Sequence, residues 1–319
     1  MSVFTTVEPE HLSALLSRYS IGTLIGLEGI ADGVINTNYR LNTTKNQFVL
    51  TLVEDPGESR ALPLLIHMIT HLANRGIPCP CPVVDNRGKV IQQLHNRPAL
   101  IVPFLPGSAP KQPSANQCHS AGKALAQMHQ AGLDCHFNRD NPMGPGTWQR
   151  QIQALSAHLQ QHNPDQITLF QSCLDHVRLA LFDQPLPQGV CHADYFPDNT
   201  LFEGEALTGI IDFFFACREI LVYDLAVALN AWCFTVDGPV KEAQFSSFLS
   251  GYQSIRPLET EEKKRLPLAL EAAALRFALS RTFDSVFPRG GSTVTKKDPT
   301  EYVRRLRLMP VYTWHRLIH

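Results

Sequence analysis

The sequence predicts a two-lobed α+β protein, with an antiparallel sheet in a smaller N-terminal lobe and a larger, mainly helical C-terminal lobe. The chain has 319 residues, which is more than one hydrophobic core usually holds. Strand-like runs gather in the first third of the chain, and helical runs dominate the rest. The Pro- and Gly-rich stretch 105–114 is typical of an interdomain connector. We therefore expect lobes over 1–104 and 105–319.

The N-terminal third alternates helices with strands. Apolar residues at helical spacing, such as Leu12 and Leu16, indicate the first helix, and a turn-prone segment at 43–47 joins two strand-like runs. The predicted elements are a helix over 8–19, a hairpin of strands over 34–44 and 47–54, a helix over 59–76, and two strands around the Asn86-Arg87-Gly88 turn, the second ending at Phe104.

The remaining two thirds are mostly helical, with one group of strands. In the last helix we expect Asp298 as N-cap, Pro299 at the first helical position and Glu301 at the third. The predicted elements are helices over 115–132 and 147–162, a strand–loop–strand–strand unit over 190–214, and helices over 223–234, 261–287 (entered near Pro267) and 298–309.

The composition excludes several classes of partner. The net charge is −1, so the chain as a whole attracts neither nucleic acid nor an anionic membrane. The eight Cys form no C-x-x-C pair, which indicates reduced thiols rather than a disulfide framework or a zinc site. The N-terminus lacks a basic region typical of signal peptides, and no apolar run reaches the ~18 residues of a membrane span. We expect a cytoplasmic protein.

One motif carries the chemistry. His192, Asp194 and Asn199 fit H-x-D-x-x-x-x-N, and Asp212 follows thirteen residues later within Ile-Ile-Asp-Phe. In phosphoryl transfer such a first Asp accepts the proton of the attacking hydroxyl, and the Asn and the later Asp hold Mg²⁺. The alternative is a simple turn rich in Asp, Asn and Pro. An acid embedded in a strand so soon afterwards favours the phosphotransferase interpretation.

The stretches "GVCHADYFPDNTLF" and "GIIDFFFACREILVYDLAVALNAWCF" resemble the aminoglycoside phosphotransferase and choline kinase superfamily, whose pattern ends in the D-L-A of Asp224. Within it, "GVINTNYRL", "GYQSIRPL", "ALRFALSR" and "KKDPTEYVRRLR" resemble bacterial homoserine kinases. The resemblance runs from about Gly29 to Arg307 and implies a protein-kinase-like fold that uses ATP and Mg²⁺.

The resemblance also implies roles for single residues. Asp194 would be the catalytic base, and Asn199 and Asp212 would hold Mg²⁺. His192 and Asp224 would brace the loop. For the nucleotide, Gly33, Asn36 and Asn38 would lie in the turn over the phosphates, and the backbone from Val102 to Phe104 would bind adenine. One departure concerns the strand after that turn, where many relatives have Lys and this chain has Thr51.

A site for homoserine needs a cationic side chain to bind the carboxylate of the substrate. Arg276 lies in a strongly apolar helical run, and Asp284 follows two turns along the same face. We expect the pair to bind the carboxylate and ammonium of L-homoserine, although a structural ion pair is the alternative. His67 and His71, four apart on a helix, could share a metal, but a half-buried helix face is the simpler role.

The sequence thus predicts ATP-dependent phosphorylation of L-homoserine to O-phospho-L-homoserine, on the way to threonine. Two alternatives stay open. One is a kinase of the same fold for choline, ethanolamine, a sugar or an aminoglycoside. A choline site would need an aromatic cage, and an aminoglycoside site a strongly acidic lobe. The other is a nucleotide-binding regulator without turnover, suggested by Thr51.

Overall fold

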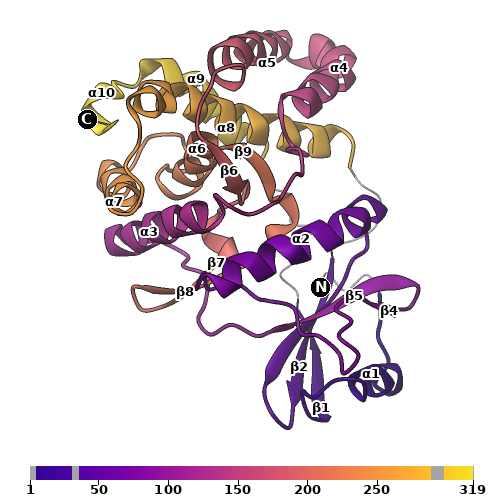
Figure 1. Ribbon diagram of the computed structural model, residues 1–319. Helices are drawn as coiled ribbons and strands as arrows, with labels where there is room; N and C mark the ends of the chain where they lie inside the picture. The colour runs from indigo at the N-terminus through magenta and orange to yellow at the C-terminus, as the bar shows by residue number, and fades with distance from the viewer. Residues whose placement is uncertain (1–4, 31–35, 289–297, 319) are drawn as a thin grey trace. The chain divides into compact units, whose positions relative to one another are not determined.

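The computed structural model describes residues 5–30, 36–288 and 298–318 (Figure 1). The described chain divides into two compact units, one over 5–30 and 36–106 and the other over 107–288 and 298–318. The first unit is mixed sheet and helix, and the second is mostly helical. This confirms the predicted α+β class with an N-terminal antiparallel sheet.

The N-terminal unit is built on a five-stranded antiparallel sheet in the order β1-β2-β3-β5-β4. Its elements are α1 (Pro9–Leu16), β1 (Leu24–Gly29), β2 (Thr37–Thr43), β3 (Gln47–Leu52), α2 (Pro56–Asn74), β4 (Gln92–Leu94) and β5 (Arg97–Pro103). Burial alternates residue by residue along β2, because successive side chains of a strand point to opposite faces. The buried face contributes Leu41 and Leu50 to a core shared with Leu12 and Leu16 of α1.

Two details of this unit differ from the sequence expectations. β1 was not predicted. The hairpin between β4 and β5 turns at His95 and Asn96, whose φ angles are 51° and 60°, and not at Asn86-Arg87-Gly88. A two-residue hairpin turn with both central residues at positive φ matches the twist of its strands, but without Gly its signal in the sequence is weak. The Asn86-Arg87-Gly88 segment is a turn without flanking strands.

The C-terminal unit combines helices with two small antiparallel sheets, β6 with β9 and β7 with β8 (Figure 1). Its helices are α3 (Ala115–Ala131), α4 (Pro145–His162), α5 (Pro164–Val177), α6 (Leu221–Trp232), α7 (Glu242–Gln253), α8 (Thr260–Val286), α9 (Thr300–Leu308) and α10 (His315–Ile318). Its strands are β6 (Gln188–Cys191), β7 (Thr200–Glu203), β8 (Ala206–Ile210) and β9 (Cys217–Ile220). In the described ranges, no helix combines the length and apolarity needed to cross a membrane.

α8 begins earlier than expected. It starts at Thr260 with a capping box, in which Glu259 and Glu262 each accept a hydrogen bond from the other's backbone N–H, and Pro267 lies inside the helix. The prediction of an entry near Pro267 was therefore wrong, because the cap determines where the helix starts and the 27-residue helix tolerates one missing N–H donor. The residues from Leu270 to Leu279 are all buried except Glu271, so the middle of α8 passes through the core of the unit.

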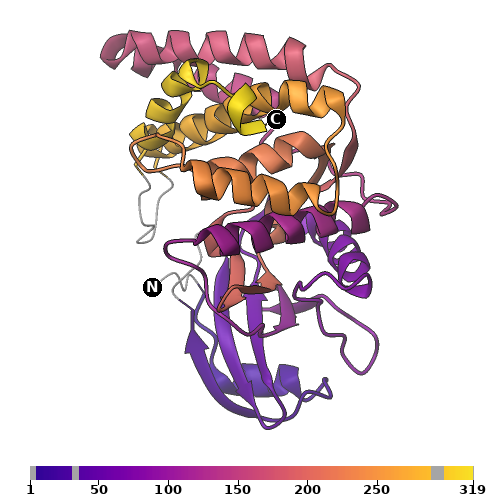
Figure 2. The same ribbon diagram turned by 90° about the vertical axis from the view of Figure 1, so that its left-hand side faces the viewer.

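α3 and α7 approach each other closely and run side by side (Figures 1 and 2). A Cβ atom at Gly122 would lie 2.0 Å from the carbonyl oxygen of Phe248, and one at Gly251 would lie 2.1 Å from that of His119. Both distances are far below van der Waals contact, and the opposing atoms are backbone. The two glycines therefore set the distance between these helices.

Gly122→Ala is expected to lower the free energy of unfolding by about 3 kcal/mol, at the upper end of the cost of overpacking, because a backbone must move. Gly146→Ala in α4 is the matched control. Its new Cβ would find only the Arg150 side chain, 3.9 Å away, so the melting temperature should stay the same or rise slightly. Equal melting temperatures for the two variants would contradict the close approach.

Candidate active site

The residues of the H-x-D-x-x-x-x-N motif lie on the loop between β6 and β7, and Asp212 is the second residue after β8. Two hydrogen bonds at Ile211 join these segments. The Ile211 N–H donates to the Asn199 carbonyl at 2.9 Å, and His192 Nε2 lies 2.9 Å from the Ile211 carbonyl oxygen. The structure therefore brings together the four residues that the motif singled out: His192, Asp194, Asn199 and Asp212.

Asn199 fixes the Asp194 side chain. Its amide nitrogen donates to the Asp194 backbone carbonyl at 2.8 Å and to carboxylate Oδ2 at 3.2 Å. Asp194 is not sealed in, because 21% of its side chain is exposed. With the nitrogen of the Asn199 amide committed to Asp194, its oxygen points elsewhere as a hard acceptor. The carboxylate is thus held in place and remains reachable.

His192 braces the loop from inside. It is fully buried, and burial lowers its pKa, which favours the neutral ring. Nε2–H donates to the Ile211 carbonyl, and Nδ1 accepts from the Asp194 N–H at 3.3 Å. This tautomer follows from the partners, since a carbonyl only accepts and an N–H only donates. The interactions agree with the bracing role that the resemblance implied.

Two residues of the site have a backbone conformation that side chains disfavour. Ala193 has φ 62° and Asp212 has φ 64°, both in the left-handed region. A residue other than Gly held there costs about 1–3 kcal/mol and persists only where its surroundings force it. Such strain is common at functional sites, so its occurrence on both sides of this site supports a catalytic role.

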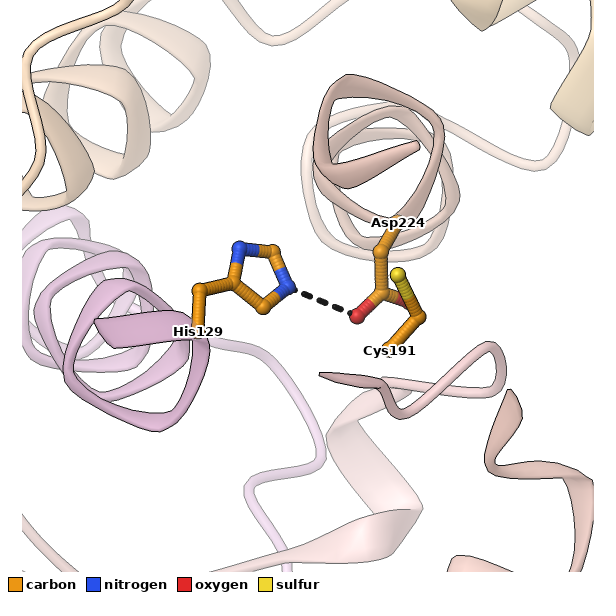
Figure 3. Close-up of side chains that lie close together, drawn as sticks. All are labelled: His129, Cys191 and Asp224. Atoms are coloured by element: carbon orange, nitrogen blue, oxygen red, sulfur yellow. Dashed lines mark hydrogen bonds and ion pairs between the residues drawn. The ribbon is translucent and has the colours of Figure 1, made fainter. Parts of the chain in front are cut away.

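Asp224 of α6 holds Ala193 in this conformation by a hydrogen bond. It is fully buried, and it accepts hydrogen bonds from the N–H groups of His192 at 2.8 Å and Ala193 at 2.7 Å. His129 Nε2 lies 2.9 Å from the same carboxylate (Figure 3). Burial acts to raise the pKa of Asp224, but the hydrogen bonds from His129 and His192 outweigh it and lower the pKa. A carboxylate held charged in the core thus fixes the start of the loop.

His129, Cys191 and Asp224 form a cluster in which one ligand atom of each lies within 4.8 Å of the others (Figure 3). Such a cluster could hold a metal, but its groups are already bonded to protein. Burial, reinforced by the charge of Asp224, raises the pKa of the Cys191 thiol well above its usual value, so the thiol stays protonated. The thiol donates to the Glu219 carbonyl at 3.5 Å. These hydrogen bonds give the cluster a structural role, in which it supports the loop that follows β6.

Arg276 of α8 also contacts this loop. Only 2% of its side chain is exposed; Nη1 donates to the carbonyl oxygen of Ala193, and Nη2 lies 3.7 Å from Asp194 Oδ1. Asp284, its expected partner in substrate binding, lies two turns further along α8 and is exposed. The apolar neighbours of Arg276 in the sequence indicate a buried charge but not its contact with the motif.

In the N-terminal unit, Asn36 and Asn38 of the predicted phosphate-binding turn lie at the start of β2. Asn36 is buried, donates to Glu58 Oε2 at 3.1 Å and accepts from the Glu54 N–H. Asn38 lies within β2, where its side chain accepts a 2.7 Å hydrogen bond from Thr51, the residue at the position of the usual Lys. Gly33 lies outside the described residues.

The segment predicted to bind adenine is the end of β5. Val102 pairs with Val49 of β3, and the Phe104 N–H donates to the Gln47 carbonyl at 3.1 Å. The guanidinium of Arg40 lies 4.4 Å from the centroid of the Phe104 ring. The end of this strand is thus fixed to β3 by its backbone and to β2 by a cation–π contact.

The chain is similar to named enzymes over almost its whole length. It is 44% identical over 307 residues to a homoserine kinase of Rhodopseudomonas palustris (strain BisB18), covering 96% of this chain and 94% of the relative. It is 43% identical over 310 residues to a homoserine kinase of Xanthobacter autotrophicus, covering 96% and 95%.

Solved structures share the fold at low identity. An amicoumacin kinase in complex with AMP-PNP, Ca²⁺ and amicoumacin superimposes with a TM-score of 0.72 at 15% identity, covering 98% of this chain and 97% of that one. A microcompartment-associated aminopropanol kinase gives 0.70 at 16% identity, covering 98% and 99%. The profile of the phosphotransferase enzyme family matches residues 26–258, which include the whole motif from His192 to Asp224. The chain therefore belongs to the phosphotransferase enzyme family.

Proposed function

We propose that this protein catalyses ATP-dependent phosphorylation of the side-chain hydroxyl of L-homoserine, giving O-phospho-L-homoserine and ADP in the cytoplasm, as a step of threonine biosynthesis. The observation that carries the proposal is that Asn199 is hydrogen-bonded both to Asp194 and to Ile211, the residue next to Asp212. Its chemistry is that of phosphoryl transfer. The name of the similar enzymes, homoserine kinase, supports the choice of substrate.

Asp194 acts as the base. Its partly exposed carboxylate accepts the proton of the homoserine hydroxyl as that oxygen attacks the γ-phosphorus of ATP. Asn199 holds Oδ2 by a hydrogen bond from its amide. The bracing by His192 and Asp224 keeps the loop in one conformation, which a base must have to meet the hydroxyl in the reactive geometry.

The donor set fits Mg²⁺, which prefers hard oxygen ligands and takes few of them from protein. Asn199 would offer its amide oxygen, since its nitrogen is bonded to Asp194, and Asp212 would offer its carboxylate. When bound, the ion would neutralise charge on the phosphates. Asp212 follows Ile211, whose N–H donates to the Asn199 carbonyl, so the two expected ligands come from adjacent segments.

For the nucleotide, we assign the lobe over 1–104 to ATP binding and the lobe over 105–319 to catalysis and substrate binding. The backbone from Val102 to Phe104 would bind adenine, and Gly33, Asn36 and Asn38 would lie near the phosphates. Thr51 donates to Asn38, its cross-strand partner, so a neutral polar pair lies where many relatives have Lys.

The substrate is tested by ADP release from Mg-ATP with homoserine, choline, ethanolamine, methylthioribose and kanamycin in parallel. Homoserine should give a kcat/KM about a hundred-fold or more above the others, as expected of a site that pairs polar groups on its substrate. ADP release that is independent of homoserine, or stronger with another alcohol, would contradict the proposed substrate.

Asp194→Asn should fold normally and lose about 10²–10⁴-fold in kcat, because it keeps the shape and loses the base. Asp198→Asn, an exposed acid in the same loop, is the matched control and should retain its rate. The measurement is steady-state ADP release for both variants. A kcat above about a tenth of wild type in Asp194→Asn would refute the assignment of the base.

Asp212→Asn should need at least about ten-fold more Mg²⁺ for half-maximal activity, because fewer charged ligands lower the affinity for a hard cation. Asn also tolerates the left-handed backbone, so folding should be preserved. The check is a magnesium titration at fixed ATP together with a melting curve. The same magnesium requirement as in wild type would rule out Asp212 as a ligand.

A further inference from the structure

Three arginines in the described part of the C-terminal unit are almost completely buried: Arg256, Arg276 and Arg305. Arg256 forms an ion pair with Glu262, and Arg305 with Glu301. Arg276 differs from them because its guanidinium lies 3.7 Å from the carboxylate of Asp194. A buried charge needs such a partner, so the charge of Arg276 is matched to the residue assigned as the base.

The guanidinium is fixed in orientation by aromatic rings. Its central carbon lies 4.5 Å from the centroid of Phe277 and 5.5 Å from that of Phe215. Phe277 also packs edge-on against Phe196 of the loop between β6 and β7, with ring centroids 4.9 Å apart. α8 therefore contacts the loop on both sides of Asp194, through Arg276 and through Phe277.

The contact with Ala193 matters because this residue is in the left-handed conformation. Asp224 holds its N–H, and Arg276 holds its carbonyl oxygen. The peptide plane that follows Ala193 leads directly to Asp194. A donor on that carbonyl therefore determines the direction in which the Asp194 side chain leaves the backbone.

We propose that Arg276 is a positioning residue, which holds the Ala193 carbonyl and the Asp194 carboxylate in the reactive geometry, and that it does not bind the homoserine carboxylate. The inference rests on the proposed function for the identity of the alcohol. One nitrogen of the planar fork donates to the Ala193 carbonyl and the other lies 3.7 Å from the Asp194 carboxylate, and the side chain is only 2% exposed, so the guanidinium faces the loop rather than solvent.

The test is steady-state kinetics of Arg276→Lys. A Lys keeps the charge but cannot serve both oxygens at once, so kcat should fall about 10–100-fold, as for a displacement of about 1 Å at a reacting group. KM for homoserine and KM for ATP should stay within about three-fold of wild type, since no substrate contact is lost. Arg276→Gln, which also removes the charge, should lower kcat further with the same KM pattern.

Arg305→Lys is the matched control. Arg305 is equally buried, donates to the Asn230 carbonyl at 2.6 Å, pairs with Glu301 and lies against the rings of Tyr302 and Phe234. Its replacement should lower the melting temperature about as much and leave kcat unchanged. A large rise in KM for homoserine in Arg276→Lys would overturn the proposal in favour of substrate binding. An unchanged kcat would overturn it in favour of a purely structural role.

Crystal structures of wild type and Arg276→Lys test the proposal without any assay. The Asp194 carboxylate should be displaced by about 1 Å in the variant, and an unmoved carboxylate would overturn the proposal. If wild type gave no ADP with homoserine, the proposed function would fail, and these structures would still decide the role of Arg276.

Discussion

The buried carboxylate of Asp224 holds the start of the loop that carries the H-x-D-x-x-x-x-N motif. It accepts the N–H groups of His192 and Ala193, and its third partner, His129, extends the bonding across the unit. On the other side of the ring, His129 Nδ1 lies 2.7 Å from the Tyr252 hydroxyl. Tyr252 in turn accepts from Arg256, which pairs with Glu262 at the first turn of α8. One continuous chain of hydrogen bonds thus links α8, α7, α3 and α6 to the loop between β6 and β7.

This arrangement explains how a strained loop persists. The left-handed Ala193 is held on its N–H side by Asp224 and on its carbonyl side by Arg276, and both anchors are buried. Because the folded-state pKa of Asp224 is lowered, its stabilisation is present above the pKa of the unfolded chain, about 3.9, and is lost as the pH falls through the folded value. The anchor is therefore intact near neutral pH, where a kinase works.

The sequence was informative where the chemistry is local. The motif from His192 to Asn199, the acid at Asp212 and the hairpin of β2 and β3 follow from short-range patterns, and the structure brings these four motif residues together. Contacts between residues far apart in the chain could not be predicted from the sequence. Arg276 reaches Ala193 across 83 positions and His129 reaches Asp224 across 95, and nothing in the neighbouring residues encodes either partner. A buried charge in an apolar helix indicated that Arg276 has a partner, but not which one.

We claim that the buried Asp224 carboxylate holds the loop that carries Asp194, and amide hydrogen exchange in Asp224→Asn tests this claim. The claim predicts that the His192 and Ala193 amides exchange about 10–100-fold faster in the variant, the loss expected for one hydrogen bond to a charged group. The Phe202 amide, bonded to the Ser108 carbonyl at 3.0 Å, should keep its rate. Unchanged exchange at His192 and Ala193, or an equal acceleration at Phe202, would contradict the claim.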